Sequence, residues 1–234
     1  QLNFVAVGLL YRQGYFTQAI DGRGQQQALY RPNQIDDLPV TLALDADGAP
    51  VRVQVELPGR AVGLHLWRAK VGHIDLYLLD SDLSENSESD RALTYQLYGG
   101  DREWRLQQEI VLGIGGVRAL RALGLAPTVW HINEGHATFQ ILERCREKVT
   151  QGMAFAAALE RVAANTVFTT HTPVAAGHDI FDAALFDRYF ASFAPALGIG
   201  LDALRAVGHS PQNQGSFNMT AAALRGSRFH NGVS

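Results

Sequence analysis

The apolar residues of this chain change their spacing near residue 100, and this change constrains the fold more than any other feature. Residues 40–44, 51–57, 62–68 and 73–79 alternate between apolar and polar side chains or run apolar. Asp-Gly, Pro-Gly and Val-Gly pairs, which favour tight turns, separate these four segments. The pattern predicts an antiparallel β meander in the first part of the chain.

The second part of the chain follows a different rhythm. Residues 101–123 carry apolar side chains at helical spacing, with Asp101 at the position of a helix cap and Gly124 at the stop. A short apolar strand at 127–132 follows, then two helices near 137–148 and 154–164, and a second strand at 166–170. Strands that alternate with helices predict a parallel sheet with covering helices, and therefore an α/β fold.

Composition excludes several classes of protein. Apolar residues make up 47% of the 234 residues and charged residues 18%, which excludes dominant disorder, and a net charge of −3 gives no reason to expect a nucleic-acid partner. Charged residues interrupt every apolar stretch before it could span a membrane. The chain has a single cysteine, Cys145, which cannot form an internal disulfide, so we expect the protein to lie in the reducing cytoplasm. Gln1 in place of an initiator Met, and an end without a polar tail, suggest an internal piece of a longer protein.

An acidic stretch follows the predicted meander. Residues 80–90 hold five carboxylates, no basic residue, and several turn-forming serines. Acidic stretches of this kind are most often solvated loops, so we expect a loop here rather than a metal site.

Polar side chains gather where the two predicted parallel strands end. Residues 131–136 read His-Ile-Asn-Glu-Gly-His, and residues 169–173 read Thr-Thr-His-Thr-Pro, followed by Gly-His-Asp at 177–179. Ligands bind beyond the carboxyl ends of strands in α/β sheets, and many donors and acceptors suit a substrate rich in hydroxyls. Four residues of this cleft, His131, Glu134, His136 and His171, also admit a metal, although no His-Glu-x-x-His spacing is present. A purely structural role for each histidine stays open.

Other catalytic motifs are missing from the sequence. The glycines at 99–100 and 113–116 do not match a phosphate-binding loop, and we expect the second group to allow close helix packing. There is no Gly-x-Ser-x-Gly, and Cys145 lies in a charged helix. Residues 11–16, rich in aromatics, indicate either an edge hairpin or a carbohydrate contact.

Several longer motifs occur together and in one order. They are Gly-Leu-Leu-Tyr-Arg-Gln-Gly-Tyr-Phe at 8–16, Leu-Tyr-Gly-Gly-Asp-Arg at 97–102, Gln-Glu at 108–109 with Leu-Gly-Ile-Gly-Gly at 112–116, the 131–136 segment, Phe-Thr-Thr-His-Thr-Pro at 168–173, and Phe-Asn-Met-Thr at 217–220. In these motifs the chain resembles the α-glucan (glycogen, starch or maltodextrin) phosphorylases, and it looks closest to the shorter bacterial type.

The resemblance implies a pyridoxal-phosphate enzyme that cleaves a terminal α-1,4-linked glucose with inorganic phosphate and yields glucose 1-phosphate. It implies a glycosyltransferase-B architecture in which residues 1–95 form the β-rich part and residues 96–234 the α/β part of one N-terminal, Rossmann-type domain. His171 matches the histidine that contacts the glucose, and Glu134 and His136 match residues that line the same pocket. Asp101 matches the start of a gate loop over the cleft. A homodimer is a family expectation.

Parts of the family's machinery have no match in this chain. Its only lysines, Lys70 and Lys148, lie outside any cofactor-binding motif, and the cofactor domain is absent. We therefore predict that this polypeptide alone contains no catalytic or cofactor-binding residue and is inactive. Two alternatives remain: a noncatalytic glucan-binding or regulatory module, and a metal-dependent hydrolase.

Overall fold

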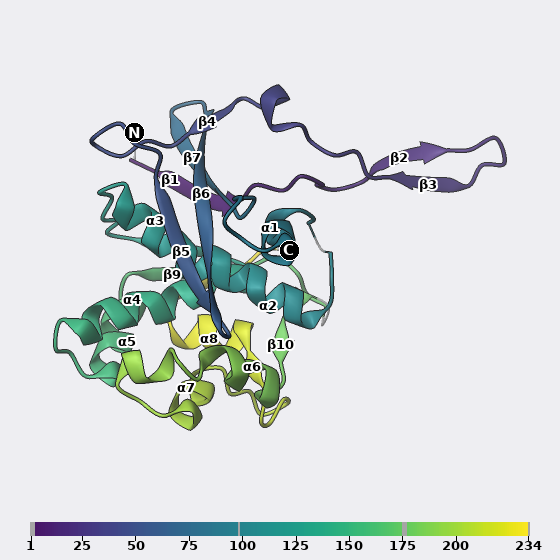
Figure 1. The fold of residues 1–234 in the computed structure, drawn as a ribbon. Coiled ribbons are helices and arrows are strands. Elements are labelled where there is room, and N and C mark those ends of the chain that lie inside the picture. The colour runs from purple at the N-terminus through teal and green to yellow at the C-terminus, as the bar shows by residue number, and fades with distance from the viewer. Residues whose placement is uncertain (1–2, 98, 175–176, 234) are drawn as a thin grey trace.

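Two hydrogen-bonded sheets form the framework of the protein in a computed structural model that describes residues 3–97, 99–174 and 177–233 (Figure 1). The first sheet has the order β1-β7-β6-β4, with β5 also paired to β6, and its strands are β1 (Val5–Leu9), β4 (Val40–Leu42), β5 (Arg52–Leu57), β6 (Arg60–Val71) and β7 (Ile74–Asp80). The second sheet is parallel, with the order β12-β9-β8, and its strands are β8 (Trp130–Asn133), β9 (Thr166–Thr170) and β12 (Phe229–Gly232). The molecule is therefore a mixed α/β protein.

The predicted meander is confirmed for β5, β6 and β7, which pair antiparallel in sequence order, but it is wrong for β4. Both β4 and β5 lie antiparallel to β6, β4 opposite residues 67–69 and β5 opposite residues 60–65. A short loop with the Asp-Gly turn at 47–48 connects β4 to β5. The Val51 N–H donates to the Ala43 carbonyl at 2.8 Å across the base of this loop, so β5 continues along β6 where β4 ends. The parallel pairing of β1 with β7 was not predicted either.

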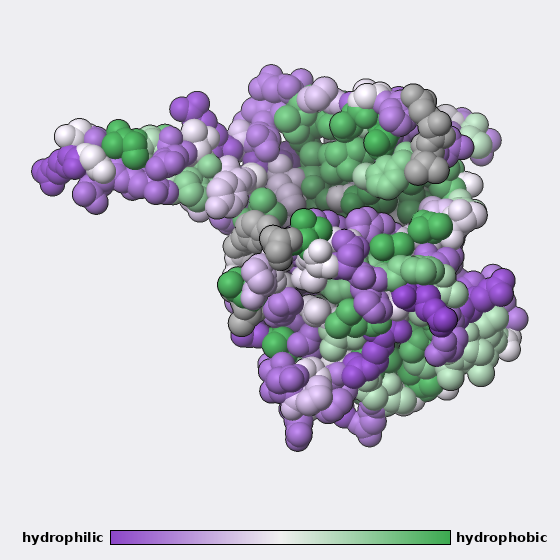
Figure 2. Space-filling view, turned by 180° about the vertical axis from the view of Figure 1, so that it is seen from behind, coloured by the Kyte–Doolittle hydropathy of each residue, from purple (hydrophilic) through white to green (hydrophobic). Residues whose placement is uncertain are grey.

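A two-stranded arm stands off the body of the molecule between β1 and β4. It consists of β2 (Thr17–Ile20) and β3 (Gln26–Leu29), which pair antiparallel and project to the right in Figure 1. Figure 2 shows the arm from behind as a mostly hydrophilic projection. Residues 11–16, for which the sequence left open an edge hairpin or a carbohydrate contact, precede this arm and lie outside its strands, and the arm is a separate sheet.

The acidic stretch at 80–90 is only partly the solvated loop that its composition predicts: residues 81–87 form loop and turn and residues 84, 85 and 87–89 are exposed, but the carboxylates at its two ends are not. Asp80 and Asp90 are buried, and each is bonded to groups from distant parts of the chain. The Trp67 indole N–H donates to Asp80 at 3.1 Å, and the Arg60 guanidinium forms a two-pronged ion pair with Asp90 at 2.8–2.9 Å. The sequence stretch lacks a base of its own, and the fold supplies bases from elsewhere.

The predicted helix at 101–123 forms with a π-helical turn in its middle. It comprises α2 (Arg102–Ile110), a π turn at Val111–Gly115 and α3 (Gly116–Ala122). Asp101 caps it as predicted, because its carboxylate accepts the Trp104 N–H at 2.9 Å. Close packing at the glycines is also confirmed: a Cβ on Gly113 would lie 2.8 Å from the Phe139 Cβ.

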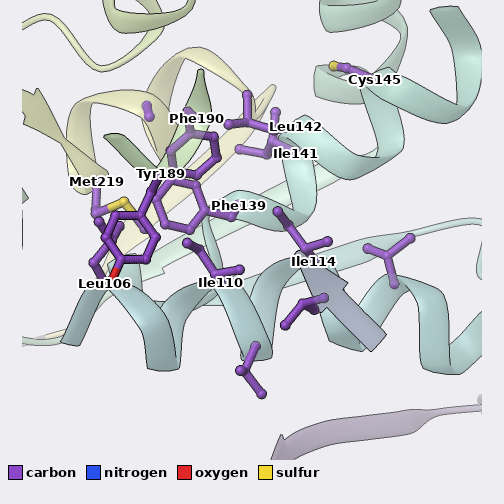
Figure 3. Packing of buried hydrophobic residues seen from close by; sticks show 14 of the residues in the cluster. Leu106, Ile110, Ile114, Phe139, Ile141, Leu142, Cys145, Tyr189, Phe190 and Met219 are labelled. Atoms are coloured by element: carbon purple, nitrogen blue, oxygen red, sulfur yellow. The ribbon is translucent and has the colours of Figure 1, made fainter. Parts of the chain in front are cut away.

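The remaining α-helices complete the core. They are α4 (Phe139–Thr150), α5 (Phe155–Ala163), α6 (Ala183–Phe190), α7 (Leu201–Val207) and α8 (Met219–Arg225), with a short α1 (Glu88–Arg91) and the small strands β10 (Ile180–Phe181) and β11 (Phe217–Asn218). Figure 3 shows the centre of the core, where α2 and the π turn face α4 and α6. Stacked rings there include Phe186 and Phe217, with centroids 4.2 Å apart. In the part of the chain that is described, no helix is long and apolar enough to cross a membrane.

Candidate active site at the strand ends

The carboxyl ends of β8 and β9 meet, as the sequence predicts. The two strands are parallel neighbours, with Asn133 opposite Thr169 in the register. The Glu134 N–H continues the ladder and donates to the Thr169 carbonyl at 2.9 Å. Residues that follow the two strands therefore lie beside each other, although 37 positions separate Glu134 from His171 in the sequence.

Glu134 ties the two strand ends together. Its side chain is 7% exposed, and its carboxylate accepts hydrogen bonds from the His171 backbone N–H and, at 3.3 Å, from the Thr170 hydroxyl. Its backbone has φ 61° and ψ −175°, a region that residues other than glycine rarely adopt. Among the described residues it is the only one besides glycine with a positive φ. This strained backbone aims the carboxylate at the segment that follows β9.

The exposed imidazole of His171 is fixed by a neighbour from the other strand end. Its Nε2 lies 2.7 Å from the Asn133 side-chain oxygen. An amide oxygen accepts only, so Nε2 donates and carries a proton, and in the neutral ring Nδ1 is left as an acceptor. Asn133, Glu134 and His171 together offer donors and acceptors at one edge of the sheet, which suits a ligand rich in hydroxyls.

His131 does not join this group. Its Nε2 lies 2.8 Å from the Thr169 hydroxyl, which itself donates to the Asn231 side chain at 3.0 Å. His131 therefore links β8 to β9 and β12 across the sheet. The structural role that the sequence left open describes this histidine well.

His136 lies in a second polar group, which we call the Glu109 cluster and define as Arg105, Glu109, His136 and Asp179. The Arg105 Nη2 atom lies 3.0 Å from His136 Nδ1, 3.0 Å from Asp179 Oδ2 and 3.3 Å from Glu109 Oε1. His136 Nδ1 is also 3.4 Å from Asp179 Oδ2 and 3.6 Å from Glu109 Oε1. The cluster joins α2, the turn after β8 and the segment after β9.

The members of the Glu109 cluster shift one another's pKa values. Burial raises the pKa of Glu109 well above its ordinary range. Hydrogen bonds to Asp179 and Glu109 raise the pKa of His136 to about 9. Burial alone would raise the pKa of Asp179, but hydrogen bonds from His136 and Glu109 and the charge of Arg105 overcome it and lower that pKa. Perturbed groups of this kind mark functional-site candidates.

The spacing of this cluster also bears on the metal hypothesis. Potential ligand atoms of Glu109, His136 and Asp179 lie within 4.8 Å of one another, and within the described ranges they form the one such group. The four residues weighed from the sequence, His131, Glu134, His136 and His171, do not converge as a metal-binding set. Arg105 already places a positive charge amid the three ligand atoms, where a metal ion would bring its own.

Asp101 lies at the start of α2, away from these contacts. Its carboxylate caps the helix, and the side chain is exposed. The adjacent Arg102 donates to the Ile180 carbonyl at 2.6 Å, which ties the start of α2 to the segment beyond β9. Tyr98 of the same motif lies outside the described residues.

Sequence reasoning missed the roles of Arg105, Glu109 and Asp179. Glu109 carried a signal in the sequence, because it is a carboxylate at helical spacing from the apolar Leu106 and Ile110. The structure buries it to 1% exposure. Asp179 stood in a polar segment after β9 without an assigned partner. Only the packing of α2 against both strand ends brings the three side chains together.

Comparisons with known proteins agree with the motifs. No protein-family model matches the chain. Curated relatives include glycogen phosphorylase of Mycobacterium tuberculosis, 44% identical over 98% of this chain, and maltodextrin phosphorylase of Thermococcus litoralis, 39% identical over 98%. Glycogen phosphorylase of Aquifex aeolicus is 32% identical over the same share. The chain spans 28%, 27% and 33% of the length of these three proteins.

A mixed α/β chain with polar groups at the joined ends of its parallel strands is thus related in sequence to sugar-polymer phosphorylases. The resemblance to the α-glucan phosphorylases is confirmed: almost the whole chain matches a segment of glycogen and maltodextrin phosphorylases.

Proposed function

We propose that this chain forms the sugar-binding side of an α-glucan phosphorylase, in which Glu134, His136 and His171 surround the terminal glucose. The reaction is phosphorolysis of a terminal α-1,4 bond by inorganic phosphate to give glucose 1-phosphate. Asp101 marks the start of the gate over the cleft. The observation that carries the proposal is the link between Glu134 and His171, which places two residues of separate family motifs in one contact.

The local chemistry supports a sugar at this place. A hexose presents hydroxyl groups in several directions, and the edge of the sheet offers a carboxylate, an amide and an imidazole held by one another. Fixed dipoles of this kind favour a transition state that develops positive charge on the sugar, because they need no reorganisation during the reaction. A cleft that excludes water would favour phosphate over hydrolysis.

Pyridoxal phosphate is implied by the family, and the residues of this chain do not fit it. The cofactor needs a lysine for its Schiff base, and the chain has two. Lys70 lies on β6, where it pairs with Asp75 at 2.9 Å, and Lys148 lies in the last turn of α4. Neither belongs to the strand ends that form the candidate site. We therefore assign the chain no cofactor-binding residue and derive no step through the cofactor.

The proposal places residues 1–95 and 96–234 in one N-terminal domain of a glycosyltransferase-B architecture, with a homodimer as the expected assembly. A cytoplasmic location accords with the buried thiol of Cys145, the only cysteine. Glucan and phosphate are the expected partners, and neither nucleic acid nor a membrane is.

Glucan binding to the chain itself is the first test. A titration with maltoheptaose followed by NMR or calorimetry should show saturable binding. His171→Ala should weaken it roughly threefold to tenfold, because one or two hydrogen bonds are lost. His131→Ala is the matched control, since His131 lies within the neighbouring strand β8 and is engaged with Thr169. Equal losses in the two variants would argue against the proposed role of His171.

Phosphorolysis requires a chimera. This chain would replace the matching segment of the Mycobacterium tuberculosis glycogen phosphorylase, which is 44% identical to it. We expect the chimera to release glucose 1-phosphate from glycogen, and the 234-residue chain alone to release none. A folded chimera that binds glucan without phosphorolysis would favour the noncatalytic binding module. Release of glucose that a chelator abolishes would favour the metal-dependent hydrolase.

A further inference from the structure

Glu109 is buried next to the candidate site without lining it. The residue is 1% exposed, and its Oε2 atom finds no hydrogen-bond partner within the described ranges of the chain. It shares the Glu109 cluster with His136, which follows Glu134 by two positions, and with Asp179, which lies in the segment that begins at His171. Glu109 can act on a bound sugar only through these neighbours.

The donors in the cluster lie nearer to Asp179 than to Glu109, whose Oε1 is 3.3 Å from the Arg105 guanidinium and 3.6 Å from His136 Nδ1. The Arg105 guanidinium donates to Asp179 Oδ2 at 3.0 Å, and His136 Nδ1 lies 3.4 Å from the same oxygen. Two ionised carboxylates here would leave Glu109 Oε2 as a charged oxygen without a donor, which burial penalises severely. If Glu109 is instead protonated, it carries no charge, and the unpartnered Oε2 costs only the burial of a neutral oxygen.

The charges that face His136 from neighbouring elements are few. Arg105 and Glu109 lie on α2, and Asp179 lies beyond β9. Tyr11 contributes only indirectly, because its charge would raise the pKa of Arg105. Arg225 on α8 is bonded to the Val207 carbonyl, and His131 on β8 to Thr169. The balance of charge at His136 is therefore set inside the Glu109 cluster.

We propose that Glu109 is a positioning residue that works as an uncharged carboxylic acid: it keeps its proton and donates a hydrogen bond to Asp179, which remains the single anion holding Arg105 and His136 in place beside the Glu134–His171 pair. The direction of the pKa shift of Glu109 accords with this arrangement. The effect of a neutral Glu109 on glucan binding rests on the proposed function, but the protonation state of Glu109 does not.

The matched variants are Glu109→Gln and Glu109→Leu. Glutamine has the shape of the protonated acid and keeps a donor toward Asp179, whereas leucine removes it. We expect Glu109→Gln to keep the wild-type stability and maltoheptaose affinity at pH 7, and Glu109→Leu to weaken binding by about tenfold. At alkaline pH, Glu109→Gln should become more stable than the wild type, because it cannot ionise. An ion pair between Glu109 and Arg105 would instead make the two variants equally damaging.

A direct measurement uses the chain labelled with 13C at the glutamate carboxyl carbons. The signal assigned to Glu109, by its loss in Glu109→Gln, should keep the shift of a carboxylic acid at pH 7, while exposed glutamates such as Glu85 show carboxylates. Titration of Glu109 in the ordinary range of a glutamate would overturn the inference, even if Glu109→Leu fails to fold. A wild-type chain that binds no glucan would overturn the proposed function, and the NMR result would still decide the inference.

Discussion

The carboxylate of Glu134 accepts the backbone N–H of His171, so a side chain that follows one parallel strand holds the segment that follows the next. The contact depends on the positive φ of Glu134, which turns the chain out of β8 toward β9. Backbone strain at this point is thus coupled to the geometry of the candidate sugar site.

Substitutions at Glu134 should separate backbone strain from the loss of its carboxylate. Glu134→Gly and Glu134→Ala both remove the acceptor for His171, but only glycine adopts φ 61° without strain. We expect Glu134→Gly to be more stable than Glu134→Ala by about 1 kcal/mol or more in urea unfolding. Glu134→Gln keeps an acceptor for His171 and should retain most of the glucan affinity that both smaller residues lose. Equal stability of the glycine and alanine variants would show that the backbone at position 134 is not strained.

The stability of the protein should fall as the solution becomes alkaline. The pKa of His136 is raised from its ordinary value of 6.5 to about 9, so its contribution is fully present below pH 6.5 and is lost as pH rises through 9. The loss should amount to roughly 2 kcal/mol, less than the full shift allows because the ring is partly exposed. Urea unfolding between pH 6 and 9.5 measures it. His136→Gln should flatten the decline and His131→Gln should not; the reverse outcome would exclude His136 as the source.

Replacement of Gly113 by alanine should damage the packing of the π turn on α4. The added Cβ would lie 2.8 Å from the Phe139 Cβ and 2.9 Å from the Gln140 backbone nitrogen, neither of which can move freely. We expect a loss of about 1–3 kcal/mol in the free energy of unfolding. Gly116→Ala is the control, because its Cβ would meet only a Val7 methyl group at 3.2 Å. A loss at Gly116 as large as that at Gly113 would contradict this account.

Arg144 should be sensitive even to a conservative substitution. The residue is 3% exposed, its guanidinium carbon lies over the Trp130 ring, 4.6 Å from the ring centroid, and its hydrogen-bond partners in the described part of the chain, among them the Thr166 hydroxyl at 2.8 Å, are neutral. Lysine has no planar guanidinium group that could stack on Trp130 and donate several hydrogen bonds at once. Arg144→Lys should therefore lower the free energy of unfolding by about 1–3 kcal/mol. The exposed Arg161→Lys on α5 should cost almost nothing. Trp130 fluorescence during urea unfolding would report both.

Local pattern was sufficient for most individual elements. Helical spacing, the Asp101 cap and the Gly124 stop predicted the long helix, and β9 forms at the predicted residues. Pattern was insufficient where partners are distant: β4 joins the edge of β6, and β12 completes the parallel sheet, through pairings that no local spacing encodes. The predicted solvated loop is confirmed for the middle of the acidic stretch but is wrong for its buried ends, because Asp80 and Asp90 pair with the distant residues Arg12 and Arg60.

The candidate site divides in the same way. Strand ends and motif order are local features, so the sequence was enough to predict that polar groups follow both parallel strands and that these motifs resemble the α-glucan phosphorylases. Three contacts could be known only from the folded chain: Glu134 bonds to His171, His131 is engaged elsewhere, and Glu109 lies near His136. Burial and charge depend on which segments meet in space, and α2 meets both strand ends only in the folded chain.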